Sequence, residues 1–206
     1  MVHKYFITGI GTNVGKTLVS AIFCQAYAAH YYKPIQAGEL TSPDALTVQN
    51  LVTTPITFYD SAYELRTAAS PHLAAQLDGV TIQLANIHLP TTTHNLIVEG
   101  AGGVLVPIND TETTLALIIK LNLPVVLVSQ HYLGSINHTL LTYEILCKHN
   151  IPIKGIVFNG ITNLSSESFI LNYTQLPCLL RIAQHDCITP QIVAQYAQEL
   201  LANSIA

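Results

Sequence analysis

A glycine-rich segment at residues 9–17 constrains the fold more than any other part of the chain. It has the sequence Gly-Ile-Gly-Thr-Asn-Val-Gly-Lys-Thr, directly follows the apolar stretch 5–7, and precedes a helical pattern that begins at Leu18. Glycines let successive backbone N–H groups surround phosphate oxygens, and the N-terminus of the next helix adds partial positive charge. The segment therefore predicts a loop that binds the phosphates of a nucleoside triphosphate, through Gly11, Thr12, Asn13, Val14, Gly15, Lys16 and Thr17.

Two residues at the end of this loop are expected to carry its chemistry. Lys16 would reach the β- and γ-phosphates, and the Thr17 hydroxyl would bind the accompanying Mg²⁺. The strict phosphate-loop pattern is not met, because Ile10 stands where that pattern requires glycine and the first glycine comes one residue earlier. The loop is thus a lengthened variant.

Gly9, Gly11 and Gly15 also form a loose variant of the dinucleotide-binding fingerprint. That fingerprint requires a carboxylate after the second strand to hold a ribose hydroxyl, whereas this chain has Lys33 there. A Gly-Lys-Thr ending also has no role in it. The residues favour a nucleoside triphosphate over a dinucleotide.

Composition indicates one well-buried domain spanning residues 1–206. Half of the residues are hydrophobic and only 10% are charged, which favours buried parallel strands and a large subunit interface. The net charge is −4 with no basic cluster, so nucleic acid is not expected as a partner. No apolar run is long enough to cross a bilayer and no signal-peptide pattern is present, so we expect a cytoplasmic protein without membrane contact.

Cysteine and histidine patterns point away from disulfides and zinc. The four cysteines form no C-x-x-C pair and sit in apolar stretches, so we expect buried, reduced thiols at Cys24, Cys147, Cys178 and Cys187. The nine histidines show no zinc-binding spacing.

Short apolar runs alternate with longer amphipathic ones, which is typical of an α/β fold with a predominantly parallel sheet flanked by helices. Strands are expected at residues 5–8, 31–33, 95–99, 124–129, 155–159 and 178–182. Helices are expected at 16–29, 70–76, 113–121, 136–150 and 190–202, the last capped by Thr189. The polar segment 39–60 predicts a working loop with a short helix. Ligands collect at the carboxyl ends of parallel strands, and polar motifs follow the expected strands.

Two of these motifs carry charge. Lys33 follows the second strand, where it can bridge a γ-phosphate and an anionic acceptor, or simply be a solvated surface lysine. Glu99 ends an apolar strand and is followed by Gly100 and Gly102, so a carboxylate on Mg²⁺ beside a closely approaching backbone is expected. A structural turn would explain the glycines but not the charge.

Three weaker motifs keep two interpretations each. Asp44 is either a second Mg²⁺ carboxylate or a helix cap. The segment Gly134-Ser135-Ile136-Asn137 opens a helix, whose free N–H groups can hold a carboxylate or merely begin a capped helix. Asn159 can read the edge of a base, although Asn-Gly is also a common turn pair.

Together these residues resemble the dethiobiotin synthetase family over about residues 5–180. The marks of the resemblance are the lengthened phosphate loop 9–17, Tyr32-Lys33-Pro34, Ser70-Pro71-His72, the run 98–103, the run 134–138 and the run 155–159. Six such motifs in the family's order make the resemblance specific. It implies a fold similar to P-loop NTPases and a homodimer with the acceptor site near the subunit interface.

The resemblance also implies an activity, that of an ATP-dependent cyclo-ligase acting in biotin synthesis. In this family 7,8-diaminopelargonic acid is carboxylated by CO₂, ATP phosphorylates the carbamate, and ring closure yields a cyclic urea, ADP and phosphate. It assigns Lys16 and Lys33 to catalysis, and Thr17, Asp44 and Glu99 to Mg²⁺. The resemblance implies that ATP is also contacted by Glu99, Gly100, Gly102 and Asn159. It implies that the substrate is contacted by Lys33 and Ala37, and by Gly134, Ser135, Ile136 and Asn137 of the partner subunit.

Three positions depart from the family's pattern. Asn13 stands where an acidic residue is common, and Ala37 where Ser or Thr often stands. The run 181–185 lacks the usual Gly-Glu-Ile-Pro-like turn near the nucleotide base. The first two departures concern how the acceptor is bound, and the third concerns which nucleotide base is preferred.

Two other classes of protein share features with this sequence. An ATP-driven dimeric switch of the partitioning or septum-positioning type has a similar fold, but such proteins carry a second lysine early in the loop, where residues 10–14 are Ile-Gly-Thr-Asn-Val. A cobyrinate-type amide synthetase would carry a glutaminase domain, for which 206 residues leave no room.

Overall fold

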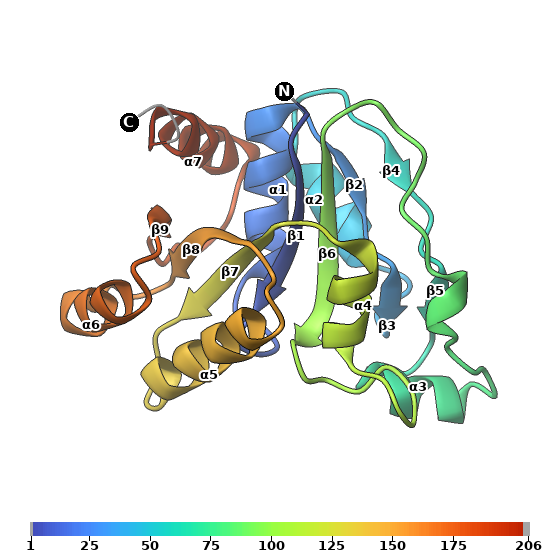
Figure 1. Ribbon diagram of the computed structural model, residues 1–206. Coiled ribbons are helices and arrows are strands. Elements are labelled where there is room, and N and C mark those ends of the chain that lie inside the picture. The colour runs from blue at the N-terminus through green and yellow to red at the C-terminus, as the bar shows by residue number, and fades with distance from the viewer. Residues whose placement is uncertain (1, 204–206) are drawn as a thin grey trace.

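A parallel sheet of seven strands forms the centre of the structure, a computed structural model that describes residues 2–203 (Figure 1). Its strands are β1 (Lys4–Gly9), β2 (His30–Tyr32), β4 (Phe58–Tyr59), β6 (Leu96–Gly103), β7 (Val125–Gln130), β8 (Ile153–Asn159) and β9 (Cys178–Ile182). They lie in the order β4-β2-β6-β1-β7-β8-β9, and every neighbouring pair is parallel. A second, two-stranded sheet pairs β3 (Ile35–Ala37) with β5 (Tyr63–Leu65).

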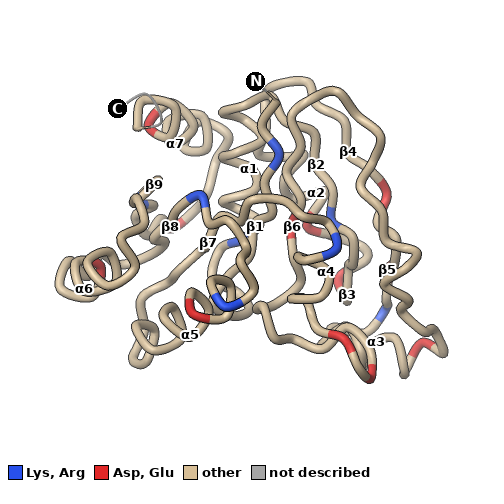
Figure 2. Tube along the Cα trace, in the orientation of Figure 1, with Lys and Arg blue, Asp and Glu red and all other residues tan. Residues whose placement is uncertain are grey.

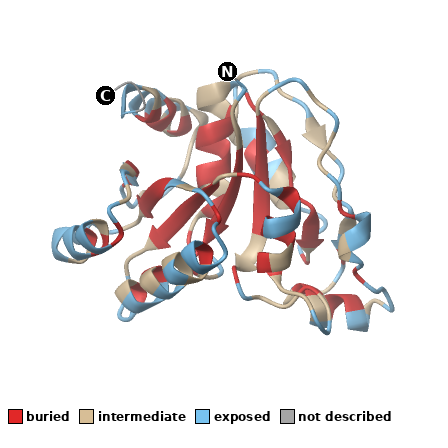
Figure 3. Ribbon diagram, viewed as in Figure 1, coloured by how far each residue is buried: buried red, intermediate tan, exposed pale blue. Residues whose placement is uncertain are grey.

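Helices cover both faces of the main sheet (Figure 1). They are α1 (Lys16–Tyr27), α2 (Asp44–Leu51), α3 (Pro71–Leu77), α4 (Thr114–Leu121), α5 (Ser135–Lys148), α6 (Leu164–Thr174) and α7 (Pro190–Asn203), with a short 3-10 turn, η1, at Leu84–Asn86. Helices α1, α2 and α7 pack on one face, and α4 and α5 on the other. The central strands lie buried between them, whereas the edge strand β4 is half-buried (Figure 3).

The core consists of two clusters, one on each side of the sheet. Val19, Val48 and Val193 bring α1, α2 and α7 into the first cluster, and all three are fully buried. Leu117 of α4 and Leu146 of α5 belong to the second. Because the central strands are covered on both faces, their sequences are continuous apolar runs rather than alternating ones.

The expected α/β fold with a parallel sheet is confirmed, and each expected strand and helix is present. Thr189 accepts a hydrogen bond from the Ile192 amide at 3.3 Å, as predicted for the start of α7. Helix α6 and strands β3, β4 and β5 are additional to the expected elements. Strand β6 also runs past Glu99 to Gly103, so this carboxylate lies within the strand rather than at its end.

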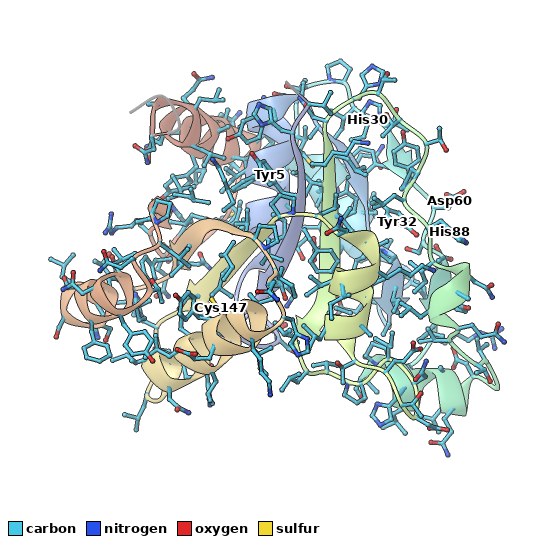
Figure 4. The ribbon with its side chains drawn as sticks, in the orientation of Figure 1. Tyr5, His30, Tyr32, Asp60, His88 and Cys147 are labelled. Atoms are coloured by element: carbon cyan, nitrogen blue, oxygen red, sulfur yellow. The ribbon has the colours of Figure 1, made fainter. Side chains whose placement is uncertain are left out.

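The expectation of four buried thiols is wrong for two of them. Cys24 is buried and Cys178 half-buried, but Cys147 and Cys187 are exposed. Cys147 lies on α5 (Figure 4), where the preceding Leu146 takes the buried position and the next residue turns to solvent. All four thiols are free, as expected.

The few charged side chains are spread over many elements (Figure 2). Within residues 2–203 no helix is long and apolar enough to span a bilayer.

Candidate functional site

A cavity of about 780 Å³ opens where strands β1, β2 and β6 end. Since these neighbouring strands are parallel, their carboxyl ends and the residues that follow them meet at one edge of the sheet. The lining includes most of the predicted site residues, namely Thr12, Asn13, Gly15, Lys16, Thr17, Lys33, Ala37, Asp44, Glu99 and Gly102.

The phosphate loop connects β1 to α1, as its sequence predicts. Gly15 adopts a left-handed conformation with φ of 95° and immediately precedes the helix. Asn13 is also left-handed, with φ of 59°, which asparagine tolerates better than most residues. Asn13, which departs from the family's pattern, therefore also lies where the backbone conformation restricts the choice of residue.

Asn159, at the end of β8, forms a hydrogen bond with this loop. Its side-chain amide donates to the Val14 carbonyl at 3.0 Å. A Cβ atom on Gly15 would lie only 2.2 Å from the same amide nitrogen, whereas one on Gly11 would meet nothing within 4 Å. The loop, β8 and α1 are thus packed without space at Gly15.

We expect Gly15→Ala to lower the melting temperature and Gly11→Ala to leave it nearly unchanged. The Gly15 variant must accommodate both a positive φ and the contact with Asn159, which together cost about 2 kcal/mol. That loss corresponds to a decrease of about 4–8 °C in a chain of this size. Calorimetric melting of both variants measures it, and equal melting temperatures would contradict the packing described for Gly15.

Lys16 is nearly buried behind the loop. Its ammonium donates to the Gly11 carbonyl at 2.8 Å, and the residue is 7% exposed. Burial lowers the pKa of Lys16 to about 8, although the negative charge of Glu99 opposes this shift. A phosphate anion beside Lys16 would favour its charged form.

Thr17, Asp44 and Glu99 converge next to this lysine. The Thr17 hydroxyl lies 3.0 Å from Asp44 Oδ1 and 2.9 Å from Glu99 Oε1. Asp44 begins α2 and Glu99 lies in β6, so the three come from separate parts of the chain. Two carboxylates and a hydroxyl are the hard oxygen donors that Mg²⁺ prefers, so this donor set fits the predicted metal.

Lys33 lies between the two carboxylates. Its ammonium donates to Asp44 Oδ2 and, at 3.3 Å, to Glu99 Oε1. Burial would lower the pKa of Lys33, but the charges of Glu99 and Asp44 outweigh burial and raise it. The solvated-surface interpretation of Lys33 is wrong, because the residue is only 7% exposed.

Tyr31 completes this cluster and is absent from the sequence-based set of site residues. Its hydroxyl donates to Glu99 Oε2 at 2.9 Å, and the residue is fully buried. Burial and the nearby charge of Glu99 raise the pKa of Tyr31 well above its usual value, so the phenol keeps its proton. The signal that could have revealed it is spacing, since residues 31 and 33 of one extended segment share a face.

The far side of the cavity is formed by Gln36, Ala37 and residues 68–71. The Gln36 amide donates to the Gly38 carbonyl at 3.0 Å, and its oxygen lies 3.4 Å from the Asp44 amide. Gln36 thereby joins β3 to the start of α2. Ser70 and Pro71, which belong to one of the motifs that mark the resemblance, also line the cavity.

The helix start at residues 134–137 does not line this cavity. Gly134 and Asn137 are exposed, Ile136 is half-buried and Ser135 is buried at the start of α5. The adjacent Leu133 is fully exposed. Within one chain, this segment is therefore not brought together with Lys33.

A second, smaller cavity of about 310 Å³ lies at the end of β8. Asn159 lines it together with Gln130 and His131 and the run 183–185. The run that departs from the family's pattern is thus adjacent to the residue predicted to read the base. Gly100 lines neither cavity, because its Cα faces Phe6, whose ring would lie 2.8 Å from an added Cβ.

Comparison with known sequences identifies the family. A family model described as an AAA domain matches residues 3–191. The chain is 50% identical over 202 residues to a protein of Cytophaga hutchinsonii named ATP-dependent dethiobiotin synthetase BioD, covering 97% of this chain and 98% of that protein. The chain belongs to the dethiobiotin synthetase family. A Christiangramia forsetii protein of the same name is 45% identical, with 97% and 96% covered, and one from Brucella ovis is 38% identical, with 93% and 91% covered.

Solved structures show the same fold at low sequence identity. The septum site-determining protein MinD of Pyrococcus horikoshii OT3, complexed with Mg-ADP, superposes with a TM-score of 0.61 at 13% identity, covering 100% of this chain and 99% of that one. A ParA family ATPase from Chlorobium tepidum TLS has a TM-score of 0.59 at 12% identity, with 100% and 95% covered. These likenesses establish a P-loop NTPase fold and nothing about activity.

Dethiobiotin synthetase membership favours the ligase prediction over the partitioning-type switch. Members of this family are ATP-dependent ligases of biotin biosynthesis, so ATP is a substrate and the remaining substrates are small molecules. The predicted family is confirmed.

Proposed function

We propose that this protein forms dethiobiotin from 7,8-diaminopelargonic acid, CO₂ and Mg-ATP. An amine of the substrate and CO₂ form a carbamate, and a carbamate oxygen takes the γ-phosphoryl group of ATP, releasing ADP. The second amine then attacks the carbonyl carbon, the C–O bond to phosphate breaks, and the amine proton is lost as the cyclic urea forms. The observation that carries the proposal is the Thr17–Asp44–Glu99–Lys33 cluster beside the phosphate loop.

The charges of this cluster suit phosphoryl transfer to an anion. A carbamate and a triphosphate repel each other, and Lys16 and Lys33 would supply two ammonium groups in one cavity. We assign Lys16 to the β- and γ-phosphates and Lys33 to the acceptor carbamate and the transferred phosphoryl group. Fixed positive charge in a partly buried site stabilises developing negative charge more strongly than it would in water.

Thr17, Asp44 and Glu99 would hold Mg²⁺ in this proposal. The metal would neutralise phosphate charge when bound. In the arrangement described above, Lys33 occupies the space between the two carboxylates. Lys33 would give up one of these ion pairs when a cation binds there, which frees its ammonium for the substrate.

The remaining assignments concern the ends of the two substrates. Ala37 and the neighbouring wall of the cavity would contact the diamine, and Asn159 would read the base through its amide oxygen, since its nitrogen donates to Val14. Gly134, Ser135, Ile136 and Asn137 would hold the distal carboxylate from the partner subunit of a homodimer. Equilibrium sedimentation tests the dimer, and a monomer at micromolar concentration would remove this assignment.

We also propose that residues 1–206 act as one ligase domain in the cytoplasm; Met1 and residues 204–206 lie outside the described part of the chain.

The test of the proposed function is ATP turnover with and without the diamine and bicarbonate. The proposal predicts that phosphate release depends on both, and that a cyclic urea of dethiobiotin's mass accumulates in equal amount. Phosphate release that ignores the diamine, with no cyclic product, would overturn the proposal. Lys33→Ala protein serves as a matched control for contaminating ATPase.

Nucleotide affinity should fall as the pH rises through about 8. Free Lys16 has its pKa lowered to about 8 by burial, and bound phosphates would raise it again. The complex then holds the proton more tightly than the free protein, so affinity is lost by up to about tenfold per pH unit above that pKa. Calorimetric titration with Mg²⁺ and a non-hydrolysable ATP analogue measures it, with Lys16→Met expected to bind weakly at every pH. A constant wild-type affinity through about pH 9.5 would contradict the role given to Lys16.

A further inference from the structure

The two oxygens of Glu99 have separate sets of partners. Oε1 lies 2.9 Å from the Thr17 hydroxyl and 3.3 Å from the Lys33 ammonium. Oε2 accepts from the Tyr31 hydroxyl at 2.9 Å. Oε1 therefore contacts groups that line the cavity and are assigned to the reaction, whereas Oε2 contacts a residue of the core.

Tyr31 holds its oxygen from a rigid position. It lies on β2, which pairs with β6 with Tyr31 opposite Ile97, two residues before Glu99. Its ring is fully buried in the first core cluster and tilts against Phe58 with ring centroids 5.8 Å apart. Tyr32, the next residue along β2 (Figure 4), packs into the opposite cluster. A side chain so enclosed cannot follow Glu99 if the carboxylate rotates.

The phenol also makes the Oε2 side costly to give up. Glu99 is only 1% exposed, so water cannot replace a lost hydrogen bond there. A buried carboxylate oxygen without a donor loses its hydration without compensation. Rotating Glu99 so that both oxygens face the cavity would leave Oε2 without Tyr31 and the phenol without an acceptor.

We propose that Tyr31 is a positioning residue that limits Glu99 to binding a divalent cation through Oε1 alone, and so favours Mg²⁺ over Ca²⁺. This inference rests on the metal site of the proposed function. Mg²⁺ requires compact octahedral coordination with single oxygens, whereas Ca²⁺ readily takes both oxygens of a carboxylate in a larger shell. A carboxylate with one oxygen tied to the core offers the first arrangement and withholds the second.

The variant Tyr31→Phe tests this inference because it removes one hydroxyl and keeps the ring. Tyr59→Phe is the matched control, since Tyr59 lies on the adjacent strand β4 and its hydroxyl pairs with His30 at 3.1 Å. Calorimetry would measure the affinity of each protein for a non-hydrolysable ATP analogue, once with Mg²⁺ and once with Ca²⁺. We expect wild type and Tyr59→Phe to prefer Mg²⁺, and Tyr31→Phe to lose about tenfold of that preference, as the loss of one charge-assisted hydrogen bond predicts.

Each outcome has a distinct meaning. A Tyr31→Phe protein with the wild-type Mg²⁺/Ca²⁺ ratio would overturn the inference and leave the metal site intact. Wild-type protein whose nucleotide affinity ignores both metals would overturn the metal site of the proposed function as well. If Tyr31→Phe does not fold, a crystal structure of the wild type with Mg²⁺ and the analogue decides. Glu99 bound through Oε1 with Oε2 still on Tyr31 supports the inference, and contact through both oxygens overturns it.

Discussion

Lys33→Ala is expected to lower kcat by about a thousandfold while nucleotide affinity changes much less. Lys33 is the ammonium that would face the acceptor and the transferred phosphoryl group, and removing one preorganised electrostatic contact typically costs a factor of about 10²–10³ in kcat. In this variant, Lys16 and the backbone amides of the phosphate loop would still bind the phosphates of the nucleotide. Steady-state rates with the diamine and bicarbonate, together with calorimetric nucleotide affinity, separate the two effects.

The same substitution should weaken the fold when no metal is present. It removes the ammonium that lies between Asp44 and the buried Glu99, and breaking such a buried ion pair costs about 3 kcal/mol. Mg²⁺ should restore part of this loss, because it would supply the missing positive charge. Lys154→Ala is the control, since Lys154 is exposed near the amino end of β8 and does not line the cavity. A Lys33→Ala enzyme with near-normal kcat would remove Lys33 from the mechanism.

Glu99→Gln is expected to lower kcat about a hundredfold and to raise the Mg²⁺ concentration needed for half-maximal rate. The amide keeps the shape of Glu99 and can still accept from Tyr31, but it loses the charge that would hold the metal. Asp44→Asn should have a smaller effect, because the Asp44 side chain is 28% exposed and water can replace it as a ligand. Rates measured over a range of Mg²⁺ concentrations compare the variants.

The ranking of these two carboxylates is the discriminating result. Equal losses in Glu99→Gln and Asp44→Asn would mean that burial does not decide their contributions. A Glu99→Gln enzyme with the wild-type Mg²⁺ requirement would show that Glu99 serves Lys33 alone and is not a metal ligand.

The main sheet and the centre of the site were predictable from the sequence for one physical reason. In a parallel sheet the residues that follow neighbouring strands meet at one edge, so Lys33, Glu99 and the phosphate loop had to lie close together. Strands β4 and β5 lacked a signal because they are two and three residues long and are bordered by polar residues, so they show neither periodicity nor an apolar run. Helix α6 has a weakly amphipathic sequence, and its place beside α5 follows from packing rather than from local pattern.

The contacts within the site were less predictable than its location. Spacing places Tyr31 on the same face as Lys33, but whether such a tyrosine serves the site or only the core is known once the partner of its hydroxyl is known. Exposure of Cys147 depends on which face α5 turns to the sheet. The helix start at Gly134 could be recognised from sequence, but its distance from the cavity depends on how α5 packs.

Transfer of an oxygen atom from CO₂ to phosphate tests the central claim most directly. If ATP phosphorylates a carbamate, the oxygen that joins phosphorus to carbon comes from CO₂ and leaves with phosphate when the urea ring closes. Turnover with the diamine, ATP and freshly dissolved oxygen-18 CO₂, stopped before exchange with water, should therefore give phosphate that carries one labelled oxygen. Phosphate without label, formed at the same rate as the cyclic product, would contradict the phosphorylated carbamate.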